Sequence, residues 1–284
     1  MRSRRVLGVA AALAMAAPAA SACPASTEAT AAAILAGWRD RVEIDAPAVA
    51  DGAAAVCVRD VYAAALGAPI GWKVGLTSKA AQEAFGVDRP VAGRLVEGML
   101  LPDGAVVSRG YGARPVVEAD LLVVVRDAGV MAARTPLEAL AHLESLVPFI
   151  ELADLMIEPG QPLSAVAIVA INVGARLGVA GAPVPLEATE DWVAALGAMT
   201  VRLEAPDGAV VAEIPGAAIL GHPLNALIWL VEELAASGGT LAPGDVVSLG
   251  SFGPPQPPDG LDGLVVRYLG LPGGIEPAVS VSFE

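Results

Sequence analysis

Arg114-Pro-Val-Val-Glu118-Ala-Asp120-Leu-Leu-Val-Val-Val-Arg126 is the stretch that decides the fold. Its β-branched residues predict a strand, and Pro115 stands at the start, where proline is tolerated. Because successive side chains of a strand point to opposite faces, Glu118 and Asp120 share one face with apolar neighbours. Two carboxylates on such a face repel each other and are costly to desolvate, so they need protons, basic partners or a metal ion. A hard divalent cation fits best.

The same pattern also has a structural explanation. An inward-pointing charge prevents sheets from associating edge to edge, and Arg114 or Arg126 could be an ordinary ionic partner. A third acidic ligand would favour the metal. Glu151 is the candidate, because it lies inside a second apolar strand predicted at residues 147–154.

A third predicted strand, at residues 70–77, contains one charged residue, Lys73. A single lysine in a strand usually extends its ammonium group to water, and this is the simpler interpretation of Lys73. Ser78 is typical of a helix N-cap and predicts a short helix that ends at Phe85. The next segment, residues 86–94, is predicted to be a loop.

The remaining pattern predicts an α+β protein with many short strands. Helices are expected at residues 27–41, 51–66, 135–146 and 223–236. Further strands are expected at residues 201–204, 210–214, 246–251, 264–269 and 278–283. Residues 163–171 fit a helix or a buried strand equally well.

The composition bounds the functional class. With 284 residues, the chain is long enough for one large domain or two small ones. The net charge of −14 disfavours nucleic acid and anionic membrane surfaces as partners. Only His142 and His222 are available, which argues against a histidine-rich transition-metal site. We interpret His222, next to Pro223, as a structural cap or loop residue rather than a base.

The N-terminus has the pattern of a secretory signal peptide. Arg2, Arg4 and Arg5 precede an apolar run at residues 6–17, and small residues before Cys23 predict cleavage after Ala22. We therefore expect an exported protein, periplasmic or secreted. The paired arginines also resemble a twin-arginine signal. The apolar run is too short for a permanent span, and we expect no membrane segment later in the chain.

Cys23 and Cys57 are the two cysteines, and export would allow them to form a disulfide. Lipidation of Cys23 is the alternative. Cleavage would remove three arginines and change the net charge from −14 to −17. Neither pattern indicates a catalytic thiol or a zinc cluster.

Several motifs together resemble the 2-keto-4-pentenoate hydratase and 4-oxalocrotonate decarboxylase branch of the fumarylacetoacetate hydrolase superfamily. They are Gly71-Trp-Lys-Val-Gly-Leu-Thr-Ser78, Phe85-Gly-Val-Asp88 with Gly93, Val117-Glu-Ala-Asp120, Ile150-Glu151, Gly221-His-Pro-Leu-Asn-Ala226 and Gly244-Asp-Val-Val-Ser-Leu-Gly-Ser251. The resemblance implies a mixed β-sheet roll of the fumarylacetoacetate hydrolase C-terminal-domain type, with peripheral helices and an N-terminal helical segment. It divides the chain into a signal peptide (1–22), a helical segment (23–69) and a catalytic domain (70–284).

The resemblance also implies a site and a chemistry. The metal triad falls on Glu118, Asp120 and Glu151, with Asp120 where a Glu is usual, and would bind Mg²⁺ or Mn²⁺. Lys73 matches the functional lysine, and near a cation its pKa should fall, allowing proton transfer or contact with a substrate carboxylate. The implied partner is a small 2-oxo acid, and the implied assembly is a homo-oligomer. Positions that match substrate contacts are Thr77, Ser78, Asn172, Gly250 and Ser251, although each could instead satisfy local backbone groups.

Two departures leave the reaction open. Relatives usually carry Asp-Ser-Arg where this chain has Asp154-Leu-Met156, and Ala-Asp-Asn where it has Ala170-Ile-Asn172. We therefore expect a hydratase-type lyase acting on a 2-oxo or 2-hydroxydienoic acid, with two alternatives: a 4-oxalocrotonate-type decarboxylase, or an exported relative that binds metal and oxo acid without catalysis. An export signal is also unusual for a family that resembles cytosolic catabolic enzymes.

Overall fold

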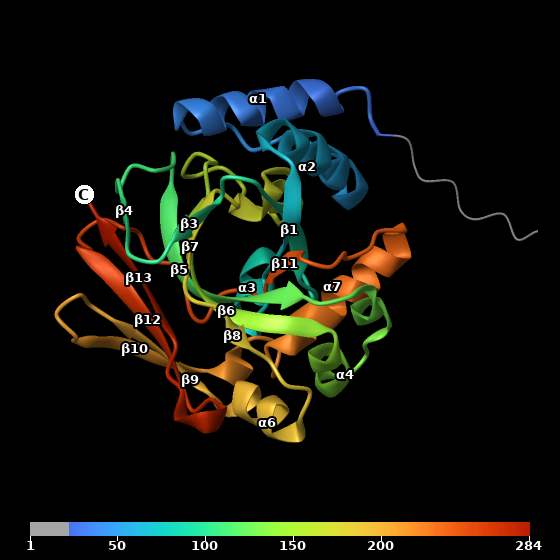
Figure 1. Ribbon diagram of the computed structural model, residues 1–284. Coiled ribbons are helices and arrows are strands. Elements are labelled where there is room, and N and C mark those ends of the chain that lie inside the picture. Colours follow the sequence, from blue (N-terminus) through green and yellow to red (C-terminus); the bar gives the residue numbers. More distant parts are fainter. Residues whose placement is uncertain (1–22) are drawn as a thin grey trace, which may run out of the picture.

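The computed structural model describes residues 23–284, and in this part of the chain the strands form two mixed sheets (Figure 1). The larger sheet has the spatial order β2 (Val91–Val96), β1 (Pro69–Gly75), β11 (Val246–Ser248), β5 (Pro115–Val125), β6 (Leu143–Asp154), β7 (Leu177–Ala180) and β3 (Leu100–Pro102), with β8 (Val184–Pro185) paired to β6. The smaller sheet has the order β10 (Val210–Pro215), β9 (Thr200–Glu204), β12 (Gly263–Leu269), β13 (Ala278–Phe283) and β4 (Ala105–Val107). The larger sheet curls around the middle of the molecule, as expected for the predicted roll.

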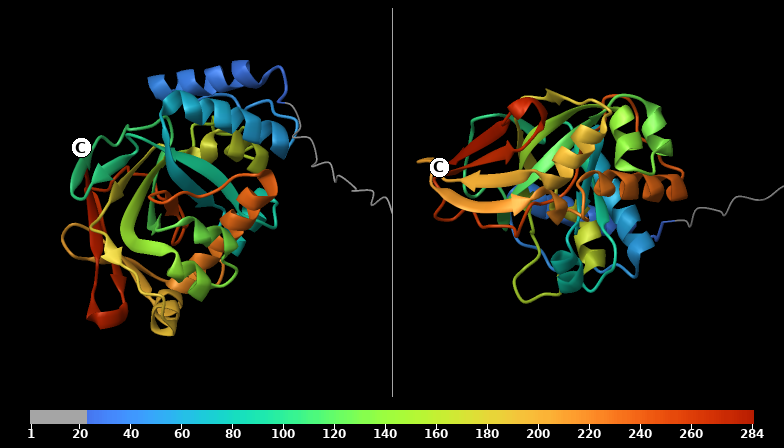
Figure 2. Two further views of the ribbon diagram at one scale, coloured as in Figure 1. Left: turned by 45° about the vertical axis from the view of Figure 1, so that its right-hand side comes forward. Right: turned by 90° about the horizontal axis from the view of Figure 1, so that it is seen from below.

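The α-helices lie around the sheets. They are α1 (Thr27–Asp40), α2 (Gly52–Leu66), α3 (Lys79–Phe85), α4 (Pro136–Ala141), α5 (Ala165–Ala170), α6 (Glu190–Ala198) and α7 (Leu224–Ser237). Helices α1 and α2 lie together at one end of the molecule, α6 lies at the opposite end, and α4 and α7 lie along one side between them (Figure 2). The expected α+β class, with peripheral helices and an N-terminal helical segment, is confirmed.

Strands β5 and β6 are the longest strands of the larger sheet and form an antiparallel pair within it. The register of this pair runs from Pro115 opposite Asp154 to Val125 opposite Leu143. On β5, the odd-numbered side chains from Val117 to Val125 join the core between the sheets and helices α4, α6 and α7. Leu122, on the other face, joins a separate apolar cluster inside the curled sheet. The predicted alternation is thus confirmed, and it sends Glu118 and Asp120 inward.

Several predicted elements are confirmed with their caps. Ser78 accepts a hydrogen bond from the Ala81 amide at the start of α3. Thr135 and Glu138 form the predicted capping box of α4. The hairpin of β9 and β10 is present, and residues 163–171 contain helix α5.

Two segments differ from the prediction. The expected loop at residues 86–94 contains the start of β2, which pairs antiparallel with β1. The helix expected to reach residue 146 ends at Ala141, because residues 143–146 pair with β5 and β8 instead. In both cases, pairing with strands distant in sequence overrides the local pattern.

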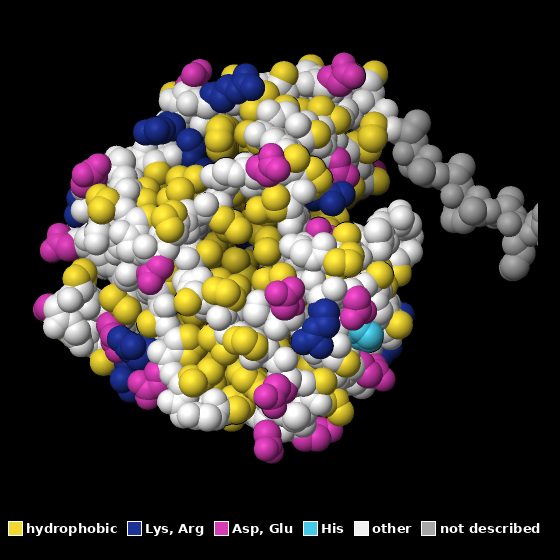
Figure 3. Space-filling model, viewed as in Figure 1, with side chains coloured by type: hydrophobic (Ala, Val, Ile, Leu, Met, Phe, Trp, Pro, Cys, Tyr) yellow, Lys and Arg dark blue, Asp and Glu magenta, His cyan; other side chains and the backbone are white. Residues whose placement is uncertain are grey.

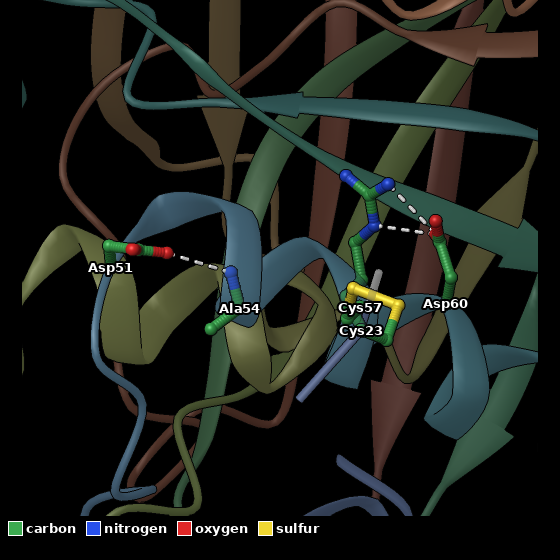
Figure 4. Close-up of a disulfide and its surroundings, with 6 residues drawn as sticks. Cys23, Asp51, Ala54, Cys57 and Asp60 are labelled. Atoms are coloured by element: carbon green, nitrogen blue, oxygen red, sulfur yellow. Dashed lines mark hydrogen bonds and ion pairs between the residues drawn. A yellow bond between two sulfur atoms is a disulfide. The ribbon is translucent and has the colours of Figure 1, made fainter. Parts of the chain in front are cut away.

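A disulfide ties the start of α1 to α2, and Arg176 links α1 to the rest of the molecule. Cys23 and Cys57 form a disulfide, so the structure supports this alternative over lipidation (Figure 4). Arg176 donates a hydrogen bond to the Trp38 carbonyl oxygen at 3.0 Å, and its guanidinium lies 4.4 Å from the Trp38 ring centroid. The predicted signal peptide lies outside the described residues.

Candidate active site

The strand pair β5–β6 brings two of the predicted acids face to face. Glu118 on β5 is directly opposite Glu151 on β6, and Asp120 is opposite Phe149. Residues directly opposite each other in an antiparallel pair have Cβ atoms only ~5 Å apart and project to the same side. Glu151 and Asp120 are buried, and Glu118 is half-buried. The interior of the curled sheet therefore carries three carboxylates.

Lys73 reaches these carboxylates from β1. The strand order places β1 two strands from β5, with β11 between them, and Lys73 is in register with Ser248 of β11. The ammonium group forms an ion pair with Oε1 of Glu151 and donates a hydrogen bond to the Val173 carbonyl oxygen at 2.8 Å. Lys73 is only 5% exposed, so it does not extend to water as a single strand lysine usually does.

The charges around Lys73 decide its ionisation. Burial lowers the pKa of the ammonium group, but the carboxylates of Glu151, Glu118 and Asp120 together outweigh burial and raise the pKa above its ordinary value. This raised pKa belongs to the metal-free protein, in which three negative groups surround the lysine; the lowered pKa that we predict concerns Lys73 beside a bound cation. Burial also raises the pKa of Glu151, against the attraction of Lys73.

Asp120 is held by donors that the sequence analysis did not identify. Its side chain accepts hydrogen bonds from the Ser248 hydroxyl and from the Gly250 amide, the latter at 3.0 Å. Burial raises the pKa of Asp120 to about 6, although the hydrogen bonds from the Ser248 hydroxyl and the Leu121 amide, and the charge of Lys73, lower it. Ser248 belongs to the quoted motif at residues 244–251. Its position one strand away from Asp120 depends on the β5–β11 register, which no local pattern reveals.

The three carboxylates have the chemistry of a divalent-cation site but are not assembled around a common point. Oε2 of Glu151 is a buried oxygen without a hydrogen-bond partner, which is costly unless another group satisfies it. The donors are all carboxylate oxygens, the type that Mg²⁺ and Mn²⁺ prefer. Within residues 23–284, no three His, Cys, Asp or Glu side chains are grouped closely enough to hold an ion. The Lys73 ammonium instead provides the positive charge beside Glu151. The donor chemistry fits, but the side chains would have to move together.

The predicted substrate-contacting residues have diverse local roles. Ser78 is the N-cap of α3, and the Ser251 hydroxyl donates to the Gly253 carbonyl oxygen at 2.9 Å. Thr77 is buried against Gly250, where a Cβ atom would lie 2.2 Å from the Thr77 hydroxyl oxygen. Gly250 also has a φ of +106°, which side chains rarely tolerate. Position 250 therefore requires glycine, both for its backbone conformation and for the space that Thr77 occupies, while its amide binds Asp120.

Both polar atoms of the Asn172 side chain are engaged within the protein. It is fully buried, and its side-chain oxygen accepts a hydrogen bond from the Arg94 amide at 2.6 Å. Its side-chain nitrogen donates to the Arg94 carbonyl oxygen at 2.9 Å. Both polar atoms of the amide therefore bind β2, and a substrate could reach them only by replacing these bonds.

The apolar departures from the family motifs lie in the core. Met156 and Ile171 are each 1% exposed and pack in the cluster beneath α1, α2 and α5, with Leu155 beside them. His222 has the structural role we predicted: its Nδ1 accepts a hydrogen bond from the Leu224 amide at the start of α7.

Comparison with known proteins shows the family. No family model matches the chain. The 2-keto-4-pentenoate hydratase 1 of Dechloromonas aromatica (strain RCB) is 34% identical over 238 residues, which are 81% of this chain and 88% of that protein. This chain belongs to the 2-keto-4-pentenoate hydratase and 4-oxalocrotonate decarboxylase family. Within the family, the 4-oxalocrotonate decarboxylase of Pseudomonas sp. (strain CF600) is 30% identical over 210 residues, or 71% of this chain and 74% of the relative. Membership identifies the protein as an enzyme.

Solved structures agree with this family. The 4-oxalocrotonate decarboxylase from Pseudomonas putida G7, complexed with magnesium and adipate, superposes with a TM-score of 0.78 at 27% identity and covers 91% of this chain and 97% of its own. Fumarylpyruvate hydrolase from Pseudomonas aeruginosa, in complex with Mn²⁺ and pyruvate, has a TM-score of 0.51 at 17% identity, covering 75% of this chain and 89% of its own. The second likeness shows only a shared fumarylacetoacetate hydrolase-type fold.

The predicted export is wrong. The relatives are hydratases and decarboxylases, members of the family whose resemblance to cytosolic catabolic enzymes already conflicted with an export signal. In the described part of the chain, no helix is both long enough and apolar enough to cross a bilayer. The arginine and alanine pattern at residues 1–22 is therefore not sufficient to predict export.

Proposed function

We propose that the protein is a divalent-metal-dependent lyase of the hydratase type, acting on a small 2-oxo or 2-hydroxydienoic acid. The observation that carries this proposal is the buried Lys73 ammonium beside Glu151, whose second oxygen has no partner. A buried polar arrangement left incomplete is expensive in a fold and is common where a ligand binds. The relatives named 2-keto-4-pentenoate hydratase support the reaction class.

We propose that Glu118, Asp120 and Glu151 hold Mg²⁺ or Mn²⁺. Support comes from the relative at 27% identity that is complexed with magnesium, and from a second complex of the same protein with calcium and acetate. When bound, such an ion would withdraw electrons from the keto group of a 2-oxo acid. The side chains contribute the negative charge and, through their burial, exclude water that would otherwise weaken their attraction for a cation.

Lys73 is the residue that we assign to proton transfer. Its ammonium group lies within the electrostatic influence of all three carboxylates. From there it can donate a proton to carbon or oxygen of the substrate, or bind the substrate carboxylate. The Gly250 amide binds Asp120 and Thr77 lies against Gly250, which supports a role of both residues in shaping the substrate pocket. Substrate contacts of Ser78, Asn172 and Ser251 remain predictions.

Decarboxylation is the second candidate reaction. It is favoured by the 4-oxalocrotonate decarboxylase of known structure, which this chain matches over nearly its whole length. Both reactions require an electron-withdrawing contact at the keto group and a proton donor nearby. The same residues would therefore carry either reaction, and the substrate decides between them.

Turnover measurements test the proposal. Purified protein with Mg²⁺ should consume a 2-hydroxydienoate, which is measured as a decrease in the ultraviolet absorbance of this substrate. If the protein is a decarboxylase, it should instead release CO₂ from 4-oxalocrotonate. Glu118→Gln should abolish turnover and the increase in melting temperature produced by Mg²⁺ plus oxalate. No turnover of any such acid, with metal binding demonstrated by calorimetry, would reject an enzymatic role of this site and favour a binding protein that does not catalyse.

We also propose that the enzyme is a homo-oligomer and that residues 70–284 form the catalytic domain. Both edge strands of the smaller sheet expose valines, with Val106 of β4 63% exposed and Val210 of β10 56% exposed, and exposed apolar side chains at sheet edges favour association. Hydrophobic side chains also gather in the hollowed middle of the face shown in Figure 3, which adds apolar surface to that of the sheet edges. Light scattering after size-exclusion chromatography tests the assembly.

A further inference from the structure

The backbone is unusual immediately before the carbonyl group that binds Lys73. Asn172 and Val173 are consecutive non-glycine residues with φ values of +59° and +55°. Asparagine tolerates this left-handed region, but a β-branched residue such as valine rarely adopts it. Residues held in such conformations cluster at functional sites and persist only when their surroundings enforce them.

The surroundings of these two residues do enforce the conformation. The Asn172 side chain makes both of its hydrogen bonds to the Arg94 backbone, one as acceptor and one as donor. Gly93 allows this close approach, because a Cβ atom there would lie 2.6 Å from the Asn172 carbonyl oxygen. Gly75 makes room for the other residue, since its Cβ would lie 2.5 Å from Cγ1 of Val173. Strands β1 and β2 thus hold both residues.

The consequence of this arrangement is the position of the Val173 carbonyl group. Its oxygen accepts the hydrogen bond from Lys73 at 2.8 Å, while Glu151 accepts from the same ammonium group. Lys73 and Gly93 are directly opposite each other in the β1–β2 ladder. Strand β1, which carries Lys73, is therefore paired with β2, whose backbone is hydrogen-bonded to Asn172. If Val173 relaxed to a negative φ, its peptide plane would rotate and the lysine would lose this acceptor.

We propose that Asn172 is a positioning residue for the reaction. By holding the β2 backbone at Arg94, it keeps Val173 in the left-handed conformation and its carbonyl oxygen against Lys73, which directs the ammonium group into the carboxylate site. This inference rests on the proposed function, in which Lys73 transfers the proton. It assigns Asn172 a role different from the substrate contact implied by the family resemblance.

Two substitutions separate the side-chain bonds from the backbone requirement. Glycine adopts positive φ freely, so Asn172→Gly removes only the two bonds to Arg94. Asn172→Asp keeps the size and the acceptor for the Arg94 amide but loses the donor to the Arg94 carbonyl oxygen. A matched control is Gln161→Ala. The Gln161 amide also binds backbone distant in sequence, accepting from Ala46 at 3.0 Å, but makes no bond to the site.

Steady-state kinetics, corrected for the folded fraction by thermal melts, give the decisive readout. We expect both Asn172 variants to lower kcat by about 10- to 100-fold, the effect of a small misplacement of a reacting group, with KM changed less than about threefold. Gln161→Ala should change only the melting temperature. An unchanged kcat in Asn172→Gly would overturn the proposal, and so would a raised KM at constant kcat, because that result assigns Asn172 to substrate binding.

Crystal structures distinguish this inference from the proposed function. In Asn172→Gly, the Val173 carbonyl oxygen should turn away from the Lys73 ammonium group, whether or not the wild-type enzyme turns over the acids tested. If the wild type is inactive but this rearrangement occurs, the proposed function fails and the positioning of Lys73 stands. If the carbonyl stays in place, the positioning role fails by itself.

Discussion

Two buried ion pairs lie near the end of β6, and they are built differently. The side chains of Lys73 and Glu151 are 6% and 3% exposed, and those of Arg176 and Asp154 are 6% and 1% exposed. Asp154 accepts hydrogen bonds from the amides of Ala113 and Arg114 and from Arg176, at 2.8–3.0 Å. Glu151, in contrast, leaves one oxygen without a partner.

The two pairs are buried to a similar extent, and they differ in whether each carboxylate oxygen has a hydrogen-bond partner. A fully bonded pair fixes backbone and stabilises the fold, whereas an incomplete pair retains a capacity to bind something else. Asp154 therefore fastens the loop before β5 and, through Arg176 and Trp38, helix α1. Glu151 and Lys73 belong to the site. The following predictions test this division.

The largest effect is expected from the lysine of the incomplete pair. Lys73→Met removes the proposed proton donor and should lower kcat by about 10²- to 10⁴-fold, the usual contribution of general acid–base catalysis. Arg176→Met, the matched change in the other pair, should leave kcat of the folded fraction within a few-fold of the wild type. Rates measured with both proteins at temperatures well below their melting points test this, and an active Lys73→Met variant would contradict the assignment.

Removal of the acid from the complete pair should mainly affect stability. Asp154→Ala leaves the Arg176 charge buried without a partner and two amides without an acceptor. We expect the free energy of unfolding to fall by about 3–5 kcal/mol. Urea titration followed by circular dichroism measures it. The double variant Asp154→Ala/Arg176→Met should recover part of the loss, and a decrease of less than about 1 kcal/mol would show that the pair is not structural.

Asp120 should make the free energy of unfolding depend on pH. In protein kept free of metal with a chelator, the folded-state pKa of Asp120 is raised from 3.8 to about 6, so the folded protein binds a proton that the unfolded chain has lost between these values. The stabilisation is present below pH ~4 and is lost as the pH rises to ~6, by about 3 kcal/mol for this group. Glu151 acts in the same direction. Urea titrations at several pH values between about 4 and about 6 measure how steeply the free energy of unfolding falls with pH. Asp120→Asn should make this dependence weaker. An equally steep dependence in that variant would contradict the assignment to Asp120.

The smallest effect distinguishes the pairs most directly. Replacing a buried ion pair by apolar residues is often neutral or stabilising. Lys73→Met/Glu151→Leu leaves one backbone group, the Val173 carbonyl oxygen, without its donor, so the free energy of unfolding should change by less than about 1 kcal/mol while activity is abolished. Arg176→Met/Asp154→Leu should lower the free energy of unfolding, because the amides of Ala113 and Arg114 lose their acceptor. Equal responses of the two double variants would remove the distinction between a structural pair and a functional one.

Much of the fold could be predicted from local pattern. The alternation along β5 gave the correct inward face for Glu118 and Asp120, and serine and threonine marked the correct starts of α3 and α4. These features depend on a few neighbouring residues, which is why they can be read without the structure. The start of β2 and the early end of α4 could not, because each is decided by a strand that lies far away in the sequence.

The sequence by itself determined which residues are acidic, basic or apolar on each face of each strand, and its motifs determined the family. Only the tertiary structure decided how Lys73 is shared between Glu151 and the Val173 carbonyl, how Ser248 binds Asp120, and why Asn172 grips β2. The physical reason is that hydrogen bonds and ion pairs form between atoms a few ångströms apart. Residues separated by about 100 positions, such as Lys73 and Val173, meet only when the whole sheet has closed.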